Sequence, residues 1–207
     1  MVALNGEDGP TWRDDIGFFS PEARIPGRPP PPLPRDAAKR AMAEAGYKGE
    51  EVRLLVPAGH FAPLGEAIAT LLRELGVSPA VQTLAPDAMA QALARPDPVH
   101  AGGWSLALGD TEAATQKDPV AHALLRGNGR DAAPGWPTSP RLETMRDAWL
   151  AAPDPAWQLR IATQMQAQAT QDVPYIPLGL SIPPSAHRTG LTGLADGLPL
   201  FWSVRRK

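Results

Sequence analysis

The sequence predicts an α/β fold in which helices flank a mixed, mainly parallel sheet. The first observation is a strand, a helix and a second strand in residues 51–84, the pattern of a right-handed βαβ unit with parallel strands. The second is that several later segments begin with a capping side chain followed by proline, as many helices do. A chain of 207 residues can hold one large domain, or a domain preceded by an arm.

The N-terminal part lacks the periodicity of the rest. Residues 1–35 show no sustained hydrophobic period and are expected to form an extended arm, whereas residues 36–207 are expected to form the α/β unit. The proline run at 29–34 favours extended polyproline geometry. The large apolar side chains with which the arm could dock on a neighbouring surface are Trp12, Ile16, Phe18 and Phe19.

The βαβ unit follows a first helix, for which Asp36 is the expected N-cap and Gly46 the residue that ends it. The strand at residues 52–56 is apolar on both faces and is expected to be buried on both sides. The next helix carries the most periodic apolar stripe of the chain, and Gly76 closes it. The stripe residues expected to face the core are Phe61, Leu64, Ile68, Leu71, Leu72 and Leu75. The second strand is expected at residues 80–84.

Further elements are expected in the second half of the chain. A short helix at residues 86–94 should be followed by a strand on which Trp104 comes after a glycine pair, which suits close backbone approach. Three helices are expected to begin at capping residues that precede proline: Asp118, Ser139 and Asp154. A strand at residues 173–181 contains prolines, which favours a sheet edge or a crossing between lobes. The apolar tail residues at 201–204 are expected to pack before the charged terminus.

Composition argues against several functional classes. The net charge is −2, the pI is near 6.1 and the basic residues are scattered, which argues against a nucleic-acid binder. With no cysteine and with four histidines far apart in the sequence, neither a metal site nor another cofactor is expected. No nucleophile motif points to an enzyme. The first residues have neither the basic nor the apolar region of a signal peptide.

Several motifs resemble, in order, those of the dipeptide- and oligopeptide-binding proteins of bacterial ABC importers, a peptide-type (family 5) group of extracellular solute-binding proteins. They are the helix and A-G-Y turn of residues 36–47, the G-W of residues 103–104, the helix start at residues 135–143, the D-V-P-Y-I-P-L of residues 172–178 and the closing F-W-S-V of residues 201–204. The resemblance covers nearly the whole chain, and it is carried by the order and spacing of the motifs together.

The resemblance implies the C-terminal lobe of a type II periplasmic-binding-protein clamshell, with residues 1–35 as a remnant of the segment between lobes. It also implies a periplasmic location, capture of a small peptide or related solute, delivery to an ABC permease in the membrane, and a missing N-terminal lobe. The implied mechanism is closure of the two lobes around the ligand, without catalysis. The alternative is a truncated structural or interaction module that binds no ligand and self-associates through its orphan cleft face.

The candidate ligand-binding residues are Trp104, Asp110 and Trp136. Trp104 is expected either in the cleft or in the core, and Trp136 either in the cleft or as a staple of the helix that follows it. Asp110 is expected to pair with a ligand cation or to be an ordinary exposed carboxylate. Peptide-binding relatives often carry aspartate three residues after the G-W tryptophan, where it meets the ligand's α-amine. Because that position is Ala107 here, a free peptide N-terminus is not the expected ligand.

Overall fold

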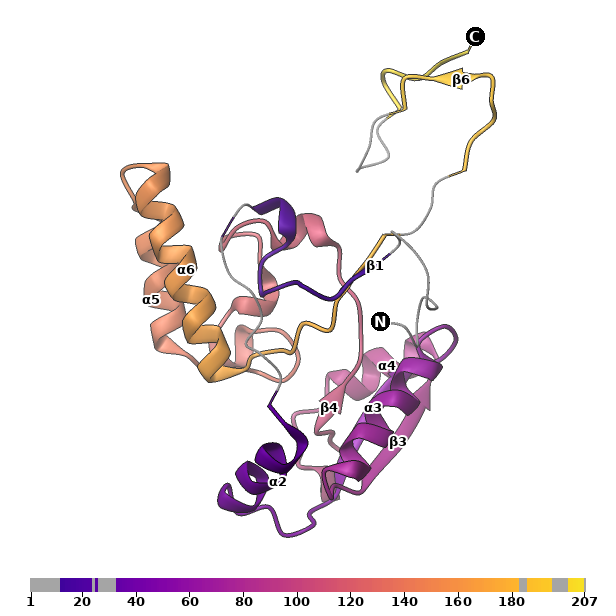
Figure 1. The fold of residues 1–207 in the computed structure, drawn as a ribbon, viewed down its shortest axis with the longest axis vertical. Helices are drawn as coiled ribbons and strands as arrows, with labels where there is room; N and C mark the ends of the chain where they lie inside the picture. The colour runs from indigo at the N-terminus through magenta and orange to yellow at the C-terminus, as the bar shows by residue number, and fades with distance from the viewer. Residues whose placement is uncertain (1–11, 24, 26–32, 183–185, 195–200, 207) are drawn as a thin grey trace.

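The computed structural model describes residues 12–23, 25, 33–182, 186–194 and 201–206 (Figure 1). Its α-helices are α2 (Arg35–Glu44), α3 (Ala62–Glu74), α4 (Pro86–Leu93), α5 (Pro140–Leu150) and α6 (Pro155–Asp172). Its strands are β1 (Trp12–Arg13), β2 (Val52–Pro57), β3 (Pro79–Leu84), β4 (Leu106–Ala107), β5 (Leu180–Ser181), β6 (Leu191–Thr192) and β7 (Arg205–Arg206). Short 3-10 turns connect several of them.

The predicted α/β fold is confirmed, and so is the βαβ unit within it. The sheet order is β3-β2-β4, and β2 pairs in parallel with both neighbours. Helices α3 and α4 pack against β2 and β3 (Figure 1). The other pairs, β1 with β5 and β6 with β7, are antiparallel and form two separate two-stranded sheets, so the three-stranded sheet itself is purely parallel rather than mixed.

The core of the sheet forms where strand and helix approach closely. Leu54, Leu55 and Val56 are all at most 2% exposed, which confirms that β2 is buried on both faces. A Cβ built on Gly65 of α3 would lie 2.7 Å from the Val56 side chain, so only glycine allows this approach. Residues 61, 64, 65 and 69 therefore line the contact face.

Leu71 is a correction to the predicted stripe. It is 47% exposed, because the face of α3 that contacts the sheet runs through Leu64, Gly65 and Ala69 and leaves this flank of the stripe facing outward. Helix α2 also begins differently from the prediction. It starts at Arg35 after Pro34, with no side-chain cap, so that Asp36 falls in the first turn.

Two of the three predicted caps start helices, and the third does not. Ser139 Oγ accepts a hydrogen bond from Leu142 N, and Asp154 Oδ1 accepts one from Trp157 N, at the starts of α5 and α6. Asp118 caps two backbone N–H groups, but only a turn follows. Arg146 of α5 donates to the carbonyls of residues 119 and 120 and so ties this turn to α5.

The predicted strand at residues 173–181 is reduced to β5. Pro174 and Pro177 have no N–H to donate to a ladder, and Val173 ends α6 with φ 47°. The pair β1–β5 then runs toward the C-terminal segment (Figure 1).

The ends of the chain differ from one another in burial. Phe18 and Phe19 form one buried cluster with Leu125 and two alanines of α6. Phe201 and Trp202, by contrast, are 69% and 84% exposed, so the expected packing of this tail is wrong within the described chain. The greater part of the proline run at 29–34 lies outside the described residues. None of the described helices combines the length and the apolar character required to cross a membrane.

Candidate functional site

Trp104 lies in the loop just before β4, not on a strand. A 3-10 turn at Val99–Ala101 ends at Gly102 with φ 98°, and the chain then passes close to its own earlier loop. A Cβ on Gly103 would lie 1.6 Å from the carbonyl oxygen of Asp97, so no other residue fits there. The predicted close approach of the glycine pair is thus met, but by the backbone of the same loop.

Trp104 and Trp136 come from separate loops and are brought together. Their ring centroids lie 6.3 Å apart with an interplanar angle of 43°, and both side chains are half-buried. A Cβ on Gly135, which has φ 104°, would lie 3.6 Å from Trp104 Cη2. Trp136 itself has φ 49°, a conformation that costs free energy in a bulky residue and that tends to occur at functional sites. The Trp104 Nε1 is buried with no hydrogen-bond partner among the described residues.

Arg53 at the start of β2 fixes the backbone beside Trp104. Its Nη1 donates to Gly103 O at 2.9 Å, and its Nη2 pairs with Glu51 at 2.9 Å. Ser105 adds hydrogen bonds to the Arg53 backbone on both sides, through its N–H and its Oγ. These contacts fix the position of the backbone that carries the Trp104 ring.

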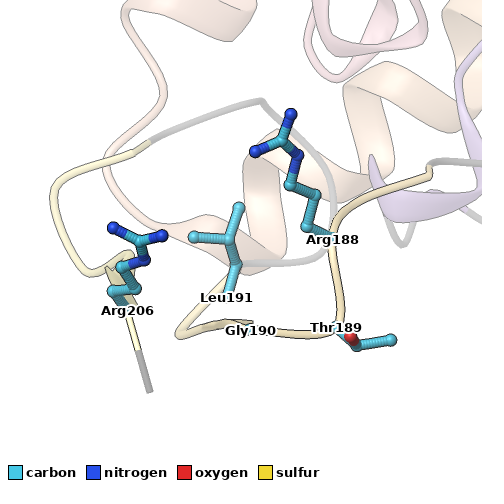
Figure 2. Close-up of a pocket in the computed structure, with 5 residues that line it drawn as sticks. All are labelled: Arg188, Thr189, Gly190, Leu191 and Arg206. Atoms are coloured by element: carbon cyan, nitrogen blue, oxygen red, sulfur yellow. The ribbon is translucent and has the colours of Figure 1, made fainter.

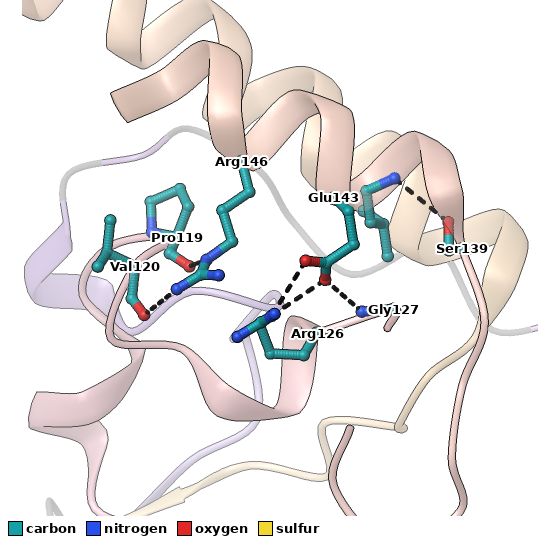
Figure 3. A network of polar contacts seen from close by, with 8 residues as sticks. Pro119, Val120, Arg126, Gly127, Ser139, Glu143 and Arg146 are labelled. Carbon is teal, nitrogen blue, oxygen red and sulfur yellow. Dashed lines mark hydrogen bonds and ion pairs between the residues drawn. The ribbon is translucent and has the colours of Figure 1, made fainter. Parts of the chain in front are cut away.

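The loop that carries Trp136 is held by a polar network on α5 (Figure 3). The Glu143 carboxylate accepts from Arg126 Nε at 3.1 Å and from Gly127 N at 2.7 Å. Partial burial alone would raise the pKa of Glu143, but these hydrogen bonds and the charges of Arg126 and Arg146 hold it below its usual value. Ser139 closes the loop, because its N–H donates to Gly127 O and its hydroxyl to Asp172.

Asp110 does not join the two tryptophans. Ser105 bonds to residue 53 at the start of β2, whereas Leu108 N bonds to Leu55 O farther along that strand. Trp104 and Asp110 therefore lie at opposite ends of β4. Asp110 is exposed and has no hydrogen bond or ion pair with the described residues. Ala107, at the end of β4, is exposed as well.

A second candidate is a hollow in the C-terminal segment, which the sequence did not indicate. It is lined by Arg188, Thr189, Gly190, Leu191 and Arg206, and Figure 2 shows Leu191 between the two arginine side chains. Two guanidinium groups suit a carboxylate or phosphate. Both arginines are exposed, however, and the segment extends away from the rest of the chain (Figure 1). The described residues hold no cluster of three or more metal-ligating His, Asp or Glu side chains.

Comparison with known proteins supports the resemblance. No protein-family model matches the chain. A probable peptide ABC transporter periplasmic-binding protein of Sinorhizobium fredii is 33% identical over 175 residues, which cover 83% of this chain and 33% of that protein. The chain thus spans about a third of the length of the curated relative that it matches.

Solved structures show the same fold at low identity. The ABC transporter substrate-binding protein CtaP of Listeria monocytogenes aligns with TM-score 0.73 and 15% identity, over 87% of this chain and 37% of that one. A dipeptide-binding protein of Pseudoalteromonas, solved with Met-Leu, aligns with TM-score 0.70 and 16% identity, over 95% of this chain and 40% of that one. In sequence, the chain is therefore similar to about a third of a peptide-type periplasmic-binding protein, and in fold it is similar to a part of these solved structures that fits one lobe.

Proposed function

We propose that this chain is the C-terminal lobe of a two-lobed periplasmic binding protein that captures a small peptide or related solute for an ABC importer. In this proposal, residues 36–207 form the lobe and residues 1–35 belong to the segment between lobes. The Sinorhizobium relative, named as a peptide-binding protein of such a transporter, supports this assignment. The partners would be the other lobe and an ABC permease, and no catalytic step is part of the proposal.

The observation that carries the proposal is the pairing of Trp104 with Trp136. Two aromatic rings from separate loops form a half-buried surface, and ligand sites are commonly walled by such rings with a few polar groups. The surrounding contacts of Arg53, Gly103 and Gly135 hold these rings in place before any ligand arrives. Asp110, at the other end of β4, would contact a different part of the cleft.

The C-terminal segment supports the presence of a second lobe. The pair β6–β7 is a two-stranded hairpin, which is marginally stable by itself in water. Phe201 and Trp202 expose large apolar surface beside it, and such surface usually marks an interface. We therefore propose that the described residues 186–194 and 201–206 face the other lobe.

The first experiment is calorimetric titration of the chain with dipeptides, tripeptides and small oligosaccharides. One lobe cannot enclose a ligand as small-molecule sites usually do, so binding should be weak, with a Kd of about 1 mM or above. Trp104→Ala should abolish it, whereas Trp157→Ala, a control on the exposed side of α6, should leave it unchanged. Equal effects of the two substitutions would contradict the proposed wall.

A non-binding module that self-associates is the second candidate. The exposed Phe201 and Trp202 favour it, because an uncovered apolar face can pair with a second copy. Sedimentation of the chain over a range of concentrations separates the two functions. A dimer that Trp202→Ser dissociates, together with no heat on any titration, would favour the module.

A further inference from the structure

Three segments that lie far apart in the sequence meet at one backbone carbonyl. Phe18 O accepts a hydrogen bond from His122 Nε2 at 2.6 Å and another from the Tyr175 hydroxyl at 2.7 Å. Because a carbonyl oxygen can only accept, the contact with His122 requires the proton on Nε2. Phe18, which supplies the acceptor, is 6% exposed, and His122, one of the two donors, is 1% exposed, so the hydrogen bond between them is shielded from water.

The rings of these residues, together with that of Phe19, pack edge to face. Phe18 and Tyr175 have ring centroids 5.2 Å apart, and Phe19 and His122 have theirs 5.6 Å apart, both near-perpendicular. Edge-to-face pairs fix the relative orientation of two rings as well as their distance. We call Phe18, His122 and Tyr175 the Phe18 anchor.

The anchor is attached to the α5–α6 pair through the turn that contains His122. The His122 N–H bonds to the carbonyl of Asp118, and the Asp118 side chain caps the N–H groups of the next residues. Arg146 of α5 then holds the carbonyls of Pro119 and Val120 at 3.0 and 2.9 Å (Figure 3). His122 therefore cannot shift without breaking contacts with α5.

On the other side of the anchor, two segments leave the α5–α6 pair together. Trp12 pairs with Ser181, and Arg13 with Leu180, in the antiparallel ladder β1–β5. Arg13 lies five positions before Phe18, and Leu180 lies five positions after Tyr175. Two stretches of equal length are thus joined at both ends, by the anchor at one and by β1–β5 at the other (Figure 1).

We infer that the Phe18 anchor is the fixed root of this two-segment connector and sets the direction in which β1–β5 leaves the α5–α6 pair. His122 and Tyr175 are positioning residues, because they act through the Phe18 backbone. Gly179, with φ 154°, lies between the anchor and β5 and allows the backbone to bend there. The inference rests on the proposed function at one point only, namely that the connector leads to the other lobe.

The test compares two tyrosine hydroxyls in the whole chain by amide hydrogen exchange. Tyr175→Phe removes one donor to Phe18 O while keeping the ring. Tyr47→Phe is the matched control, because the Tyr47 hydroxyl also donates to a carbonyl, that of Glu50, but near α2. Tyr175→Phe should accelerate exchange about fivefold in peptides covering residues 12–20 and 173–181. Exchange in β2 should not change, and Tyr47→Phe should not alter the connector.

Unchanged exchange in both connector segments would overturn the inference. So would equal acceleration in β2, because it would show general destabilisation rather than a local root. If Tyr175→Phe does not fold, the same comparison with His122→Gln, which keeps an N–H donor but loses the ring, decides the question in the same way. No ligand is used, so failure here is distinguishable from failure of the proposed function.

Discussion

Two leucines of α3 belong to the same predicted stripe, but substitution by alanine is expected to lower the free energy of unfolding much more at one than at the other. Leu64 of α3 is 7% exposed and packs in the cluster of Leu54, Val56, Phe61 and Leu108. Leu64→Ala leaves a cavity beneath the sheet, and such substitutions cost about 2–5 kcal/mol in the free energy of unfolding. A value in the middle of that range is a large share of the stability of an ordinary domain.

Leu71 is the matched control on the same helix. It is 47% exposed, so replacing it by alanine loses at most roughly half of the transfer free energy of a fully buried leucine. Alanine also has the higher helix propensity, which offsets part of the loss. Leu71→Ala should therefore cost less than about 1 kcal/mol.

Urea unfolding followed by circular dichroism measures both differences under one set of conditions. The predicted result is a loss for Leu64→Ala at least twice that for Leu71→Ala. Equal losses, or a larger loss for Leu71→Ala, would refute the placement of the contact face of α3 along Leu64, Gly65 and Ala69.

Three other predictions concern the site and the packing around it. Gly103→Ala should displace the loop at Asp97 and disturb the indole signal of Trp104, since the added Cβ of the alanine has no room. An unaltered spectrum and an unaltered melting temperature would contradict this prediction. Ser139→Ala should cost about 1–2 kcal/mol in thermal unfolding through loss of the α5 cap, and Ser139→Thr should recover part of it. Burial lowers the pKa of His122 below 6.5, so the unfolded chain binds the proton first, and the free energy of unfolding should fall as the pH drops below about 6.5. His122→Phe should flatten that part of the pH profile, and an identical slope in the variant would assign the dependence to another group.

The local patterns of the sequence predicted the βαβ unit well. Alternation in β2, a helical stripe and a closing glycine are signals within a few residues of one another, and the sheet then formed with the expected parallel order. The orientation of α3 was harder to predict, because it depends on Gly65 against Val56, a contact between two elements. The turn that replaces the predicted helix after Asp118 is likewise held by a distant residue, Arg146 of α5.

The candidate site was only partly accessible from the sequence. Trp104 and Trp136 were singled out separately, and nothing in their spacing of 32 positions shows that their rings meet. The glycines beside them, Gly103 and Gly135, were the available signal, since Gly103 leaves room for the backbone of Asp97 and Gly135 adopts φ 104°. Asp110 was grouped with them by position in the chain, but β4 separates it from the pair in space. The Phe18 anchor left no local signal, because His122 and Tyr175 each lie more than a hundred positions from Phe18 in the sequence.

The indole N–H signals of the six tryptophans offer the most direct test of the central claim, that Trp104 and Trp136 form a ligand-contacting wall. Two-dimensional nitrogen–proton spectra of the chain, assigned by single Trp→Phe variants, would be recorded during titration with dipeptides to high millimolar concentration. The account predicts that the Trp104 and Trp136 signals shift together along one saturating curve while those of Trp149 and Trp157 stay in place. It is contradicted if these two signals do not move, or if only Trp157 or Trp202 responds.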